Sequence, residues 1–108
     1  MTITRKGYDD DALLQHPVFQ SSYFKTTVDK LAEAGITSYS KLIEVVADET
    51  VEHDIRATVT WTVSNVRQAI NTRYVVTPLL KASHSFSEQV RSAAIHSLAM
   101  IDSAKVTS

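Results

Sequence analysis

Apolar and polar residues follow one another along much of this chain with the three- and four-residue spacing of amphipathic helices. Residues 23–34 show the pattern clearly, with one helix face formed by Phe24, Val28, Leu31 and Ala34. Gly35 then provides a stop, because glycine readily adopts the left-handed conformation that ends many helices. Upstream, Asp9–Asp11 can cap a short helical turn at Ala12–Leu14, which Pro17 limits.

Three further helices follow from the same spacing. The first begins after Thr37 or Ser38, both suitable capping residues, and continues through Ala47. The second covers residues 74–82, and the third begins at Glu88 after a polar loop. The chain has only two glycines and two prolines. Because hairpin-rich β folds need frequent glycine-containing turns, this scarcity favours helices.

Two stretches of the chain match each other. Ile55–Val66 aligns with Val90–Ile101 without a gap, and every aligned pair is 35 residues apart. Each has a β-branched residue, an arginine and then small and apolar residues. Tyr23 can be placed opposite Ile55 as the start of a weaker third copy. Periods of about 20–50 residues mark repeat architectures. We therefore expect one domain, 1–108, divided into a tail at 1–8, a degenerate repeat at 9–35, and repeats at 37–67 and 72–103.

The first copy poses a conflict between two secondary structures. Residues 58–63 alternate threonine with valine or tryptophan, which by itself indicates a strand. The matching residues 93–98 contain alanines and do not alternate, so they indicate a helix. Two copies of one motif should share a conformation. We therefore predict a helix at 55–66 and an all-α fold.

Composition limits the function. The 108 residues are 44% hydrophobic and 21% charged, which is typical of a globular domain. The net charge of −1 does not favour nucleic acid or an anionic membrane as a partner. No apolar run is long enough to cross a membrane, and the N-terminus lacks the apolar core of a signal peptide. The chain has no cysteine. We expect a cytoplasmic protein.

The two copies define two stripes of side chains at helical spacing. The shared apolar positions form a core stripe of Val59, Val63, Val66, Ala94, Leu98 and Ile101. A second stripe contains Ala57, Trp61, Asn65, Ser92, His96 and Met100, to which the third copy adds Lys25, Asp29 and Glu33. We take the second stripe, without its two small residues Ala57 and Ser92, as the candidate partner-binding residues.

Trp61 is the most informative residue of the second stripe, because it is the only tryptophan. Exposed tryptophan is typical of interaction surfaces. Equally, Trp61 can fill a gap between helices or pack under the N-terminal tail. His96 fits a solvated or hydrogen-bonded histidine better than a metal ligand or base.

Catalytic and metal-binding patterns are missing from the sequence. No two histidines lie at i, i+4, and the acidic run 48–54 lacks the glycine and alternating oxygen ligands of a calcium loop. We interpret that run as a solvated loop. The chain has no phosphate-binding loop, dinucleotide fingerprint or nucleophile motif. We expect neither enzyme activity nor a cofactor.

The last copy resembles the second helix of a HEAT repeat, through Val90-Arg91, Ala94, Ser97-Leu98-Ala99 and Ile101. It is most similar to the short bacterial repeats related to phycobilisome lyases. Thr77–Ala82 is similar to the proline-containing first helix of such a unit. The glycine and aspartate that usually follow the second helix are replaced after Val66 by Arg67-Gln68.

The resemblance implies a curved α-solenoid of about 2.5–3 antiparallel helix pairs, whose second helices line a concave binding face. It also implies a structural role for Arg56 and Arg91, which in this family bridge neighbouring repeats through loop carboxylates or carbonyls. Asp48, Glu49 and Asp54 are the nearby candidate partners of Arg56.

Three functions remain open at this point. The first is a non-catalytic scaffold that binds another protein, or itself, through the concave face. The second is an accessory subunit of an enzyme system, as among bilin-lyase-like proteins. The third is nucleic-acid binding, as in HEAT-like DNA glycosylases, although Lys25 is the only cation on the stripes. A short stack also exposes apolar ends, so a homodimer through an end is a further expectation.

Overall fold

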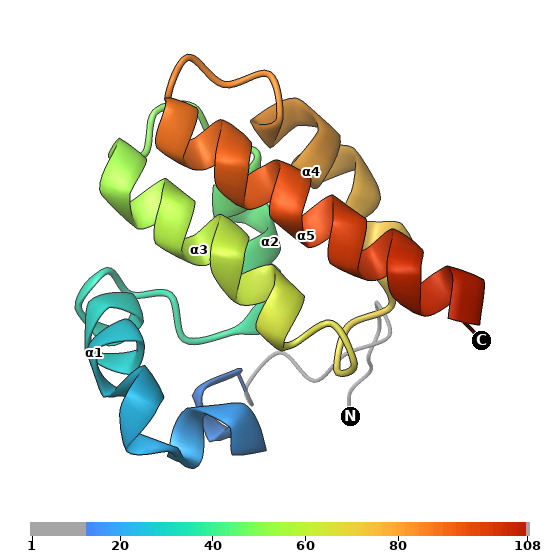
Figure 1. Cartoon of the computed structure of the whole chain (residues 1–108). Coiled ribbons are helices and arrows are strands. Elements are labelled where there is room, and N and C mark those ends of the chain that lie inside the picture. The colour runs from blue at the N-terminus through green and yellow to red at the C-terminus, as the bar shows by residue number, and fades with distance from the viewer. Residues whose placement is uncertain (1–12, 108) are drawn as a thin grey trace, which may run out of the picture.

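The computed structural model describes residues 13–107, with side chains described through residue 102. Within these residues the fold is all-α, as the sequence predicted, and no strand is present (Figure 1). The α-helices are α1 Lys25–Glu33, α2 Tyr39–Val46, α3 His53–Asn65, α4 Val76–Ala82 and α5 Glu88–Thr107. Short 3₁₀ helices accompany them at Leu13–Gln15, Pro17–Gln20, Ser22–Phe24 and Thr72–Tyr74.

The segment before α1 differs from the predicted single turn. Leu13–Gln15 forms a 3₁₀ helix, and Pro17 begins a second one instead of ending the helical region. His16 caps this second helix, because its Nδ1 accepts a hydrogen bond from the Val18 amide at 3.1 Å. Proline is favoured at a first helical position, where no amide hydrogen is needed. The predicted tail 1–8 and the cap at Asp9–Asp11 lie outside the described residues.

Gly35 ends α1 as predicted. Its φ of +77° is left-handed, and the Ile36 amide donates to the Leu31 carbonyl at 2.8 Å. The Gly35 amide donates to the Ala32 carbonyl at 3.1 Å, which completes a Schellman motif. The two bonds satisfy carbonyls that the end of the helix would otherwise leave unpaired.

Helix α3 confirms the helical interpretation of the strand-like segment. Three of its threonine hydroxyls donate to carbonyls one turn back, namely Thr58 to Asp54, Thr60 to Arg56 and Thr62 to Thr58, at 2.9, 2.7 and 2.7 Å. The threonines of the apparent alternation therefore satisfy their polar groups on their own helix. Val59 and Val63 are buried against the neighbouring helices. Burial thus overrides the local β preference.

The helices form two layers. Helices α3 and α5 lie side by side and run in the same direction, with α2 and α4 behind them (Figure 1). Helix α1 packs against α3 on the side away from α5. The predicted core stripe lies between the layers: Val59, Val63, Val66, Ala94 and Ile101 are buried and Leu98 is half-buried.

Candidate functional site

A groove crosses the face formed by α1, α3 and α5. Its volume is about 490 Å³, and its lining residues are Thr27, Ala57, Thr58, Trp61, Gln89, Ser92, Ala93 and His96. The repeat-derived second stripe contributes four of these residues, two from α3 and two from α5. The groove forms because α3 and α5 carry the small residues Ala57, Ser92 and Ala93 where the two helices meet, with the larger Trp61 and His96 beside them. None of its described lining residues carries a carboxylate, ammonium or guanidinium group.

Trp61 is partly covered by its neighbours and partly open to the groove. Its ring lies 5.8 Å from the Phe24 ring, tilted by 32°, so the 3₁₀ segment before α1 covers part of it. Phe24 also makes edge contacts with Phe19 and Tyr23. Trp61 is half-buried, and its solvent-exposed surface lines the groove. An aromatic cluster thus holds one large, rigid side chain at the groove wall.

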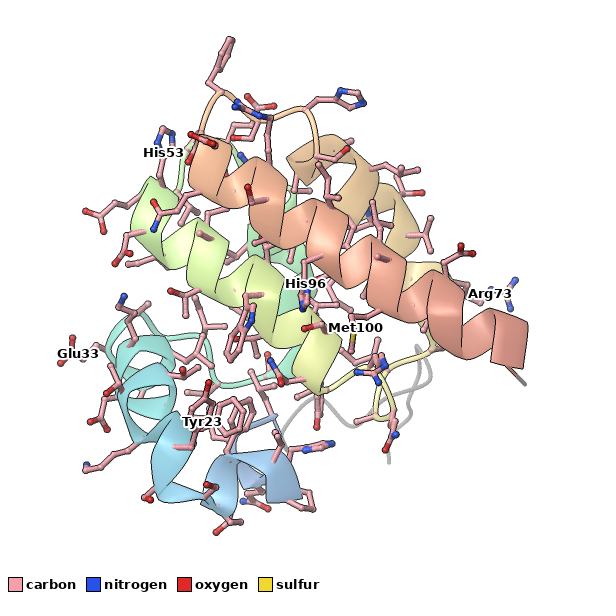
Figure 2. The ribbon with its side chains drawn as sticks, in the orientation of Figure 1. Tyr23, Glu33, His53, Arg73, His96 and Met100 are labelled. Atoms are coloured by element: carbon pink, nitrogen blue, oxygen red, sulfur yellow. The ribbon has the colours of Figure 1, made fainter. Side chains whose placement is uncertain are left out.

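The partners of Trp61 on the second stripe separate in space. His96 is exposed on α5 and lines the groove. Figure 2 shows His96 and Met100 in the strip between the α3 and α5 ribbons, although Met100 is not a lining residue. Asn65 is half-buried and donates its amide to the Trp61 carbonyl at 3.3 Å. The groove therefore occupies the N-terminal two-thirds of the stripe.

The α1 residues of the second stripe do not reach the groove. Lys25 and Asp29 form an ion pair at 3.4 Å and line a separate hollow of about 310 Å³. Glu33 is exposed at the outer edge of α1, away from His96 (Figure 2). The expected continuous surface is wrong here, because α1 runs antiparallel to α3, with Phe24 near Trp61 and Lys30 at Asp54. Reversing a helix while the same face stays buried moves its flanking stripe to the other side. Thr27 takes the groove position instead.

Arg56 is buried, with 1% of its surface exposed, and joins two segments. Its Nε donates to the Val46 carbonyl at 2.9 Å, and its Nη1 lies 3.5 Å from the Ser85 hydroxyl. Nη2 has no hydrogen-bond partner in the described structure. The expected carboxylates are not its partners. Arg56 thus ties the end of α2 to the loop before α5 through neutral oxygens.

Arg91 reaches the same loop from the other side. Its Nη1 donates to the Ser85 carbonyl at 2.9 Å and to the Phe86 carbonyl at 3.1 Å. Ser85 itself accepts the Ser87 amide at 3.1 Å, and Ser87 caps α5 by accepting the Val90 amide at 3.3 Å. Two arginines and two serines therefore shape the loop that starts α5. None of these groups faces the groove.

The contacts of Asp54 with α1 and α5 were not predicted from the sequence, because the segment 48–54 was interpreted as a loop. Asp54 lies in the first turn of α3, where a carboxylate suits the helix dipole. Lys30 of α1 donates to it at 2.8 Å, and the Gln89 side chain of α5 also hydrogen-bonds to it. The Lys30 hydrogen bond and charge, followed by the Gln89 hydrogen bond, lower the pKa of Asp54. Asp54 thus links three helices beside the groove.

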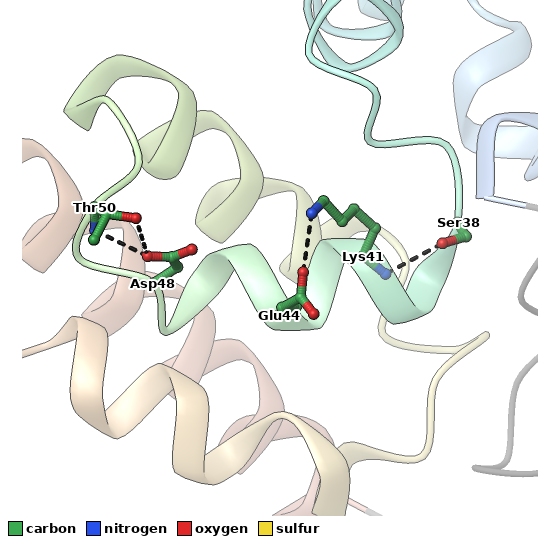
Figure 3. Close-up of polar contacts among 5 residues, drawn as sticks. All are labelled: Ser38, Lys41, Glu44, Asp48 and Thr50. Atoms are coloured by element: carbon green, nitrogen blue, oxygen red, sulfur yellow. Dashed lines mark hydrogen bonds and ion pairs between the residues drawn. The ribbon is translucent and has the colours of Figure 1, made fainter.

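The other end of the acidic run folds as a local turn. Figure 3 shows Asp48, which accepts the Thr50 amide at 2.9 Å and the Thr50 hydroxyl at 2.6 Å. These two hydrogen bonds lower the pKa of the Asp48 carboxyl. The same figure shows Ser38 capping α2 through the Lys41 amide at 3.2 Å, which selects one of the two caps that the sequence allowed. Among residues 13–102, whose side chains are described, no three metal-ligating side chains gather.

Comparison of the chain with protein-family models, with curated proteins and with solved structures found no match. In the part of the chain that the structure describes, no helix combines the length and apolar character needed to cross a membrane.

Proposed function

We propose that this chain is a non-catalytic protein-interaction module of the HEAT type, which binds a partner protein in the groove between α3 and α5. The observation that carries the proposal is the groove itself, where Trp61 and small side chains from repeated helices meet. Repeat proteins commonly bind along the surface that their stacked helices form.

The arrangement of helices supports the HEAT-type part of the proposal. Helices α2 and α3 form one pair and α4 and α5 a second, and the matching helices α3 and α5 run in the same direction (Figure 1). Helix α1 lies on the other side of α3 and runs antiparallel to it, since Phe24 before α1 contacts Trp61 late in α3 and Lys30 bonds to Asp54 at the start of α3. The two helix pairs stacked in the same direction support a short solenoid-like stack, with α1 at one of its ends.

The lining of the groove indicates what kind of partner fits. Ala57, Ser92 and Ala93 are small, so a partner backbone can approach them closely. Trp61 offers a large contact area at little entropic cost, as interface tryptophans do. The groove has no cation for phosphate contacts, which makes a nucleic acid a poor fit. We expect an uncharged face of a partner helix, with small residues toward the groove.

Selection from a displayed library of helical peptides tests this function, with the emission of Trp61 as the readout. We expect selected peptides to shift this emission, because Trp61 is the only tryptophan and lines the groove. Ser92→Arg places a long side chain in the groove and should abolish binding. Ala32→Arg, at an exposed position on α1, is the matched control and should bind normally. Selected peptides that bind Ser92→Arg as well as the native chain contradict the proposal.

A further inference from the structure

The outer face of the last helix pair carries a second apolar hollow, separate from the groove. It has a volume of about 430 Å³ and is lined by Val76, Leu80, Leu98, Ala99, Ile101 and Asp102. Ile95 precedes Ala99 by one helical turn, so it lies on the same face of α5. Leu80 is 49% exposed and Ile95 58% exposed. We call the surface formed by Val76, Leu80, Ile95, Leu98 and Ala99 the end face.

The internal repeat shows what the end face corresponds to. With the offset of 35, Ile95 is the counterpart of Thr60 and Ala99 is the counterpart of Ser64. Thr60 and Ser64 are buried, and α5 packs against α3. Their counterparts on α5 are exposed. The end face therefore repeats the surface by which α3 receives its neighbour, and has an isoleucine where α3 has a threonine.

The opposite end of the helix stack differs in character. There α1 buries Leu31 toward α3 and exposes Lys25, Asp29 and Glu33. A polar outer face of this kind is what a terminal repeat needs in water. Head-to-tail stacking would place these charged groups against Leu80 and Ile95, with a desolvation cost and no compensating charge. The α1 end is therefore a poor partner for the end face.

We infer that the end face binds the end face of a second copy of this chain, in a two-fold symmetric dimer. In such an interface each copy contributes the same residues, so the apolar surfaces match by symmetry. The contact adds one further layer of helices, in which each α5 presents the face that on α3 is covered by α5. Asp102 lies at the margin of the hollow, where a carboxylate can keep its water. This dimer leaves the groove with Trp61 and His96 open for its own partner.

Light scattering after size-exclusion chromatography of the whole chain tests the dimer. We expect a mass of twice the 12.0 kDa chain mass at high concentration, falling toward 12.0 kDa on dilution. Ile95→Glu should give 12.0 kDa at every concentration with an unchanged helical circular dichroism spectrum, since its site is exposed in the single chain. Leu80→Glu, from the other helix of the face, should do the same. A chain that is monomeric throughout overturns the inference.

A groove variant separates this inference from the proposed function. His96→Glu lies on α5 but outside the end face, so the dimer should persist. If His96→Glu dissociates the dimer and Ile95→Glu does not, the groove mediates self-association and the end-face dimer is wrong. Peptide binding in the groove has its own readout and can fail while the dimer stands.

Single-cysteine cross-linking tests the symmetry. The chain has no native cysteine, so Ala99→Cys gives one thiol per copy. A short bismaleimide should join two copies through this position, because a two-fold interface brings equivalent residues together. Glu33→Cys on α1 should remain without a covalent cross-link under the same conditions. Efficient cross-linking of Glu33→Cys but not Ala99→Cys contradicts the proposed interface.

Discussion

The hydroxyl of Ser97 in α5 donates a hydrogen bond to the main-chain carbonyl of Thr60 in α3, at 2.8 Å. Both residues are fully buried. A hydroxyl can reach a carbonyl on another helix only where the two backbones approach closely. Ser97 therefore marks the line along which α3 and α5 are pressed together, behind the small residues that form the groove. The α3–α5 contact and the groove depend on the same choice of small side chains.

Substitution of Ser97 should reveal this close approach. Ser97→Ala removes one buried hydrogen bond and should lower the free energy of unfolding by about 1 kcal/mol. Ser97→Leu also forces the helices apart and should cost about 1–3 kcal/mol more. Urea denaturation followed by circular dichroism gives both values. Ser92→Ala, on the same helix but exposed, should change stability by less than about 0.5 kcal/mol. Equal effects of Ser97→Leu and Ser92→Leu would show that the interface is loose.

Replacement of Arg56 and of Arg91 by lysine should lower the stability of the fold by different amounts. The Arg56 guanidinium contacts Val46 and Ser85 from a buried position, and an ammonium cannot serve both. We expect Arg56→Lys to lower the free energy of unfolding by about 2–3 kcal/mol, because it leaves buried polar groups unpaired. Arg91 is only half-buried, so Arg91→Lys should cost about 1 kcal/mol or less. Thermal unfolding of the two variants provides the comparison. The reverse ranking contradicts the role assigned to Arg56.

The effect of substituting Gly35 should depend only on how readily the new residue adopts the left-handed backbone conformation. A Cβ added at this position would meet no atom within 4 Å, so the cost of a side chain comes from the φ of +77°. Gly35→Ala should lower the free energy of unfolding by about 1 kcal/mol. Gly35→Asn should cost less, because asparagine adopts the left-handed region more readily. Urea denaturation measures both. An alanine variant as stable as the native chain would contradict the left-handed end of α1.

Acid should weaken the link between α1, α3 and α5. The pKa of Asp54 is lowered from 3.8 by Lys30 and Gln89, so folding favours its charged form. The resulting stabilisation is present above the unfolded pKa and is lost as the pH falls through the lower folded pKa. Denaturation of native chain and Asp54→Asn across this range should show a stability difference that shrinks with acid. The difference should also shrink with salt, since the Lys30 pair is partly exposed. A stability difference that does not change with pH contradicts the lowered pKa of Asp54.

Lys30→Gln provides the control for the acid prediction. Removal of the ammonium should reduce the pH dependence that Asp54 contributes, because Lys30 is the first cause of the lowered pKa. Combined with Asp54→Asn, it should add little further destabilisation, since both variants remove one interaction. Additive effects would show that Asp54 and Lys30 act independently.

The repeat was sufficient to predict much of the fold. The match between residues 55–66 and 90–101 identified α3 as a helix against its own threonine-valine alternation. It also identified the buried positions Val59 and Val63, because helical spacing and apolar character decide them locally. Gly35 and Ser38 marked helix boundaries for similarly local reasons: one supplies a left-handed residue and the other a side-chain acceptor.

The candidate site was only partly predictable. Trp61 and His96 share a stripe in the sequence and line one groove in the structure. Lys25, Asp29 and Glu33 were expected beside them, but α1 runs antiparallel to α3, which places them elsewhere. That direction depends on how Phe24 and Lys30 contact α3, which a weak repeat match does not determine.

The sequence by itself determined the α-helices, the end of α1 at Gly35 and the buried faces of α3 and α5, because these depend on spacing, capping and residues only a few positions apart. The tertiary structure alone decided which oxygens Arg56 reaches, how Asp54 joins three helices, and that the end face is exposed while its counterpart on α3 is covered. Those features depend on distances between segments far apart in the chain. Packing of whole helices sets these distances, and no local pattern encodes them.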